Sequence, residues 1–100
     1  LLVGFELGKI AEAAAALEQA FQRQAPLDKK KRPREADWVA ALERFHRDAL
    51  RIREQYRLGL LARAGVAYRL QQRLIAAGYP VEAVRQVVFS LVLKAFIGKG

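Results

Sequence analysis

Residues 36–57 read ADWVAALERFHRDALRIREQYR, and the spacing of their apolar and charged side chains decides the fold class. Apolar side chains recur at alternating steps of four and three, which places them on one face of an α-helix. Arginines fall between them and are expected to point mostly elsewhere, so one face should pack on a core and the other meet water or an anion. The apolar positions are Trp38, Leu42, Phe45, Ala49, Ile52 and Tyr56; the arginines are Arg44, Arg47, Arg51, Arg53 and Arg57.

The flanking segments show the same helical spacing, so we predict an all-α protein in which residues 1–100 form a single helical bundle of three to four helices. Residues 2–24 form the first predicted helix, which ends before Pro26 because the residue preceding a proline is pushed out of the α region. Gly78 predicts a helix stop, and the last helix is expected to begin at Pro80 and run to about Ile97. The apolar start without a methionine predicts that the chain is a piece of a longer one.

The predicted long central helix spans residues 36–77 and contains Gly59 and Gly65. A glycine inside a helix costs about 1 kcal/mol relative to alanine, so we expect a bend or short break between Leu58 and Gly65. One unbroken helix is the alternative. Beyond the break, a new apolar stripe is expected at Leu60, Ala64, Ala67, Leu70 and Leu74.

The positive charge is concentrated in the middle of the chain. The net charge of +8 divides into −2 over residues 1–28, +8 over residues 29–73 and +2 over residues 74–100. Such a block favours nucleic acid, an anionic membrane or an acidic protein as partner. An arginine-rich proteome would give the same composition without any such partner.

Residues 26–35 are predicted to form an exposed basic linker, because its dense like charges resist helix formation. The linker matches a short phosphate-binding or nuclear-localisation run, and a solvated connector is the alternative reading. Together with a ridge of helix arginines it predicts sequence-independent binding to the nucleic-acid backbone. The predicted nucleic-acid-binding residues are Lys29, Lys30, Lys31, Arg32, Arg34, Arg44, Arg47 and Arg51.

The last predicted helix is apolar almost all round, which a helix on the protein surface does not need. It is therefore either the central helix of the bundle or a helix that partly covers a partner or the remainder of a longer parent chain. If the helix covers a partner, the chain is predicted to be a protein-interaction or oligomerisation module. Its predicted partner-binding residues are Val88, Phe89, Val92 and Phe96.

Residues able to carry chemistry are few, so we expect a non-catalytic segment with no cofactor and no metal. The chain has no cysteine and a single histidine, His46, which is expected to be partly exposed. Ser90 has neither an acid nor a histidine near it in sequence, so its hydroxyl is expected to bond a backbone carbonyl. No stretch is long and apolar enough to predict a membrane span, and a cytoplasmic protein is expected.

Two stretches together resemble the helical bundle that follows the catalytic domain of small plasmid primases and primase-linked mobilisation proteins. The first is Ala41-Leu42 with Phe45; the second runs from Tyr68 to Val84 and includes a helix ending in Leu-x-x-x-Gly, a short turn and a helix that opens with Glu82. The last three helices of RecX regulators and ubiquitin-associated domains are partly similar. The primase resemblance implies an accessory module that helps to engage single-stranded DNA, with the polymerising residues elsewhere in the parent protein.

Overall fold

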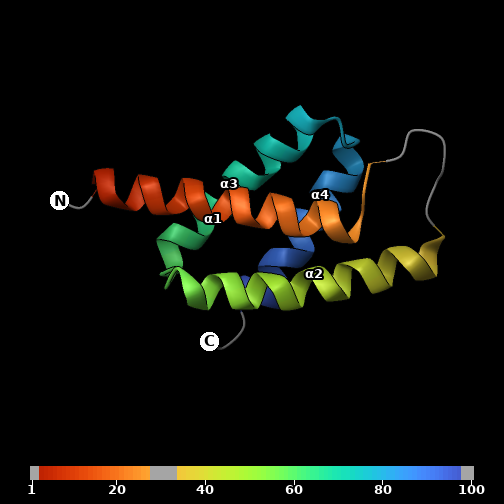
Figure 1. Cartoon of the computed structure of the whole chain (residues 1–100), viewed down its shortest axis with the longest axis horizontal. Helices are drawn as coiled ribbons and strands as arrows, with labels where there is room; N and C mark the ends of the chain where they lie inside the picture. Colours follow the sequence, from red (N-terminus) through yellow and green to blue (C-terminus); the bar gives the residue numbers. More distant parts are fainter. Residues whose placement is uncertain (1–2, 28–33, 98–100) are drawn as a thin grey trace.

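The computed structural model describes residues 3–27 and 34–97 and confirms the all-α prediction (Figure 1). In this part of the chain there are four α-helices and no strand. They are α1 (Val3–Gln24), α2 (Glu35–Gln55), α3 (Leu60–Ala77) and α4 (Val81–Leu91), and α4 continues into the π-helical segment η1 (Val92–Phe96). Residues 36–77 thus form two helices, and the unbroken helix is excluded.

The bundle is built around α1, which packs against both α2 and α3. Helix α4 packs mainly on α3, and η1 reaches back to α2, so the first and last helices are joined through the two between them. The predicted apolar stripe of α2 is confirmed, because Leu42, Phe45, Ala49 and Ile52 are buried. The largest fully buried side chains are Phe21, Phe45, Leu17, Leu70, Leu74, Leu91, Val66, Val84 and Val87.

Small residues let α1 and α3 approach closely. Ala13 and Ala14, in the alanine-rich segment of α1, are fully buried. Opposite them on α3, a Cβ atom built on Gly65 would lie 3.1 Å from Cδ1 of Ile10, closer than a relaxed contact. Gly65 therefore lies inside a helix, at a crossing, and is not part of a bend.

The break between α2 and α3 is shorter and earlier than predicted. Helix α2 ends at Gln55, Arg57 adopts a left-handed backbone with φ of 51°, and Gly59 precedes the first residue of α3. This turn sets a different rotation for α3, since Leu60 and Ala64 of the predicted stripe are exposed while Ala62 and Val66 are buried. Ala67, Leu70 and Leu74 are buried as predicted.

The turn between α3 and α4 follows the prediction to within one residue. Gly78 has a φ of 107°, the left-handed conformation that ends helices and that only glycine adopts readily. Pro80 precedes α4 where it was expected to be its first residue. Tyr79 between them is buried, and its hydroxyl donates a 2.8 Å hydrogen bond to the carbonyl oxygen of Ala25. The turn is thereby tied to the end of α1.

Candidate partner-binding groove

Four aromatic rings form a cluster at one end of the bundle, and this cluster is the floor of the groove described below. The ring of Phe21 meets three others edge to face: Trp38 at 6.1 Å, Phe45 at 5.4 Å and Tyr79 at 5.1 Å between centroids. These rings come from α1, from α2 and from the turn before α4. Edge-to-face pairs are favourable beyond their buried area, so the cluster fixes the position of these three elements relative to one another.

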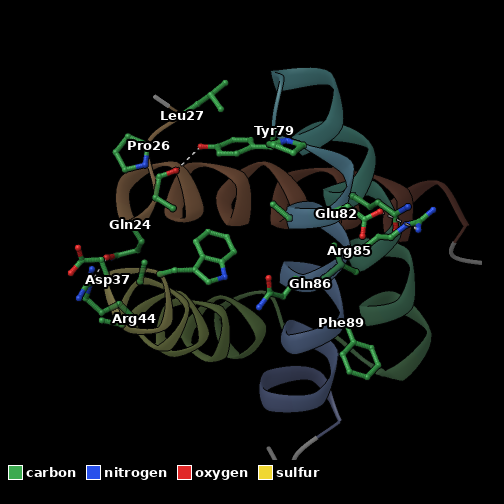
Figure 2. Close-up of a pocket in the computed structure, with 18 of the residues that line it drawn as sticks. Gln24, Pro26, Leu27, Asp37, Arg44, Tyr79, Glu82, Arg85, Gln86 and Phe89 are labelled. Atoms are coloured by element: carbon green, nitrogen blue, oxygen red, sulfur yellow. Dashed lines mark hydrogen bonds and ion pairs between the residues drawn. The ribbon is translucent and has the colours of Figure 1, made fainter. Parts of the chain in front are cut away.

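A groove lies above this cluster and follows both flanks of α4 (Figure 2). One flank faces α2, since Nε2 of His46 lies 3.0 Å from Oγ of Ser90. Ala83 and Gln86 lie seven and four residues before Ser90, which places them on the same side of the helix. This arm of the groove is lined by Ala83 and Gln86 together with Trp38, Ala41 and Tyr79.

The other flank of α4 carries Arg85, Val88 and Val92, at steps of three and four, and Gln71 of α3 also lines it. Phe89 stands between the two arms and is 67% exposed. Its ring points outward from α4 in Figure 2, away from the side on which Gln86 lies. The groove therefore contains three of the four predicted partner-binding residues: Val88, Phe89 and Val92.

The prediction for Phe96 is wrong, because this side chain is 2% exposed and packs in the core. The cause is the π-helical turn of η1, in which Ile97 donates its backbone N–H to the carbonyl oxygen of Val92, five residues earlier. A wider turn brings the residue five after buried Leu91 back toward the core. An α-helix would have directed Phe96 outward.

The charged side chains around the groove are of both signs. Glu35, Asp37 and Glu82 line it together with Arg44 and Arg85, and an exposed ion pair of 3.9 Å joins Arg85 to Glu82. Helix α2 begins at Glu35, and Glu35 and Asp37 both lie in its first turn, where a negative charge complements the helix dipole. In a chain of net charge +8, the groove is thus a region where acids are not outnumbered.

The predicted ridge of arginines on α2 is partly bound to other protein groups. Nε of Arg44 donates a 2.6 Å bond to Oε1 of Gln24, whose amide nitrogen bonds Asp48 at 3.3 Å. Arg51 forms an ion pair with the same Asp48. Arg47 is exposed, and the described residues offer it no ion pair. Because α2 holds five acids against four arginines, its outer face is not uniformly cationic.

The remaining predicted nucleic-acid-binding residues belong to the basic linker. Lys29, Lys30, Lys31 and Arg32 lie outside the described residues. Arg34 is exposed immediately before α2. Helix α3 has three arginines and no acid; its Arg69 and Tyr68 are exposed, and Arg73 donates a 2.6 Å bond to Glu18 of α1.

Two arginines bond the end of the last helix, and one of them, Arg53, was expected to point outward. Arg53 is only 7% exposed, and its Nη1 donates a 2.6 Å hydrogen bond to the carbonyl oxygen of Ala95. Arg63 donates from Nη1 to the carbonyl of Phe96 at 2.6 Å and from Nε to that of Leu58 at 2.9 Å. Helix ends leave carbonyls without an intrahelical partner, and a cation there also complements the helix dipole.

His46 and Ser90 form a contact between α2 and α4 that sequence spacing did not reveal. The prediction that the Ser90 hydroxyl bonds a carbonyl is confirmed, since it donates to Val87 at 3.0 Å, and His46 is half-buried. Burial lowers the pKa of His46, with nearby Lys94 acting in the same direction and Glu43 opposing both. Burial, aided by Glu18, raises the pKa of Tyr79, so its hydroxyl keeps the proton that it donates.

Residues 3–27 and 34–97 contain no group of three histidine, cysteine or acidic side chains arranged to hold a metal ion. None of their helices combines the length and the apolar character needed to cross a membrane. No family model matches the chain, and comparisons with curated proteins and with solved structures find no significant match.

Proposed function

We propose that this chain is a protein-interaction module whose groove along α4 receives the apolar face of a helix from a protein partner. The supporting observation is that apolar side chains stay exposed opposite the buried face of α4. That face packs in the core through Val84, Val87 and Leu91, and Val88 and Val92 lie partly buried against it. Phe89 is instead largely exposed, and Leu93 one turn later is exposed as well. A soluble surface rarely exposes contiguous apolar side chains unless something binds them.

The shape and composition of the groove match the recognition of an amphipathic helix. Such helices insert side chains spaced by three or four residues into an apolar groove, and polar groups at the edge set their direction. Here an exposed aromatic ring lies beside apolar walls, and Gln86, Arg44 and Asp37 are polar groups at the edges. Aromatic side chains are enriched at the centres of interfaces, where truncating a central residue can cost about 2 kcal/mol or more.

Selection from a displayed library of amphipathic helical peptides tests this proposal. Binders should lose most of their affinity for a Phe89→Glu variant and keep it for Leu61→Glu. Leu61 is a matched control because it is 88% exposed, on α3, and does not line the groove. Trp38 is the only tryptophan and lines the groove, so its fluorescence should respond to binding. Binders that tolerate Phe89→Glu, or a library that yields none, would contradict the proposal.

A second candidate function is binding to the nucleic-acid backbone, as the resemblance to the primase-associated bundle also implies. It is favoured by the five bases of residues 29–34 and by α3, whose three arginines have no acid beside them in the helix. Each neutralised phosphate releases counterions, so log affinity should fall steeply with log salt. Changing Lys29, Lys30, Lys31 and Arg32 to Gln should reduce that slope. Absent or salt-insensitive binding to single- and double-stranded DNA and to RNA would exclude this function.

A further inference from the structure

We infer that the protein partner of the α4 groove is a second copy of this chain, in a two-fold pair. The inference rests on the proposed function and names its partner. In a two-fold interface the same surface is used by both copies, so each copy must present both the projecting and the receiving part of the contact.

The α4 surface presents both parts side by side. Phe89 projects from the helix, and an arm of the groove lies on each side of it. When two such helices cross face to face, the ridge of one can enter an arm of the other, as in ordinary packing of ridges into grooves. The two-fold axis then makes the reverse contact identical, so each Phe89 becomes buried in the partner copy.

The exposed apolar surface continues along the helix beyond Phe89. Leu93 and Ile97 follow at steps of four, and both are exposed. The α-helical part from Glu82 to Leu91 is about 15 Å long at 1.5 Å per residue, and Leu93 and Ile97 extend the exposed apolar surface beyond it.

The charges at the groove also favour a second copy. Two copies of net charge +8 repel each other wherever bases predominate, as around exposed Arg69 on α3, a helix that has no acid. The groove instead carries Glu35, Asp37 and Glu82 with Arg44 and Arg85. A surface that bears both signs can place unlike charges opposite each other across a two-fold axis, and so meets the least repulsion there.

Sedimentation of the whole chain over a concentration series tests the inference. The wild-type chain should form a dimer as concentration rises, and Phe89→Glu should weaken the dimer by roughly a hundredfold or more, because each dimer loses two buried rings and gains two charges. Leu61→Glu, which introduces the same charge at an exposed leucine outside the groove, should leave it unchanged. Raising the salt concentration should not dissociate the dimer.

Far-ultraviolet circular dichroism should show unchanged helix content in both variants, since both positions are exposed. A wild-type chain that stays monomeric at millimolar concentration would overturn the inference, as would equal weakening by the two variants. If the monomeric chain still binds helical peptides through Phe89, only the choice of partner is wrong. If the chain binds neither a second copy nor helical peptides, the proposed function is wrong as well.

Discussion

The two ends of the bundle differ in which groups they leave exposed. At one end, around η1, Arg53 and Arg63 donate to carbonyl groups that the last helix leaves without partners. At the other end, around the first half of α4, the aromatic floor is packed but the surface above it stays apolar and open. At the first end, arginines of the chain itself bond the free carbonyl groups, whereas at the second end apolar side chains line an open groove.

This difference separates structural arginines from surface arginines. A high arginine content suggests a polyanion partner, yet Arg53 and Arg63 hold the fold together, Arg44 and Arg51 bond groups on α1 and α2, and Arg73 pairs with Glu18. Net charge therefore overstates the number of arginines that are free of bonds to other groups of the chain. The exposed apolar side chains of α4 are the more informative feature.

The largest effect is expected from removing the ring that supports the groove floor. Phe21 is fully buried and touches three other aromatic rings. Phe21→Ala should lower the free energy of unfolding by about 3–5 kcal/mol, because it removes a large buried side chain and leaves a cavity. Urea unfolding measures this loss. A loss below 1 kcal/mol would mean that the floor is loosely packed and that the groove has no fixed shape.

The next effect tests the end of the bundle around η1, where Arg53 bonds the carbonyl oxygen of Ala95. Arg53→Met keeps an unbranched apolar stem but removes the guanidinium that donates to Ala95, leaving a buried carbonyl without that bond. The free energy of unfolding should fall by about 1.5–3 kcal/mol, the usual range for a hydrogen bond to a charged group. Arg47→Met, at an exposed position on the same helix, is the control and should change it by less than about 0.5 kcal/mol. Equal effects at the two positions would show that Arg53 has no special structural role.

Much of the fold follows from local sequence signals. Pro26, Gly78 and Pro80 mark helix boundaries through their own backbone preferences, and the four-and-three spacing of Leu42, Phe45, Ala49 and Ile52 marks the buried face of α2. These signals act within a few residues, so they can be seen in one sequence.

The errors concern features set by contacts between distant segments. The left-handed backbone at Arg57 changed which side chains of α3 are buried, and the wider turn of η1 buried Phe96. Sequence spacing gives no warning of either, since both depend on how the bundle closes. Arg53 shows the same limit, because its acceptor at Ala95 lies 42 residues away. For the groove, spacing indicated Val88, Phe89 and Val92 but not Trp38, Tyr79 or Gln86, which only the packing of α1, α2 and α4 brings together.

A smaller effect tests the link between the groove and the end of α1. Tyr79→Phe removes the hydroxyl that donates to Ala25 and keeps the ring. The free energy of unfolding should fall by about 1 kcal/mol, the net value of a typical hydrogen bond. The same substitution at exposed Tyr68 serves as control and should have almost no effect. If the two variants unfold alike, the bond to Ala25 does not stabilise the fold.

The smallest effect concerns pH and the contact between α2 and α4. The pKa of His46 is lower in the folded chain than the ordinary histidine value of about 6.5. As the pH falls below 6.5, the unfolded chain therefore binds a proton at this side chain more readily than the folded chain does. The stabilisation is complete above that pH and is lost as pH falls through the folded pKa. His46→Gln should reduce the difference in unfolding free energy between pH 7.5 and 5.5. An unchanged difference would show that His46 titrates alike in both states.

Hydrogen–deuterium exchange of the wild-type chain at low and high concentration is the most direct test of whether the groove along α4 is an interaction surface. Residues 36–44 of α2 and residues 81–93 of α4 and η1 should exchange more slowly at high concentration, while residues 60–69 of α3, which do not line the groove, should not change. Slower exchange confined to α3, or no change in α4 at any concentration, would contradict the proposed contact.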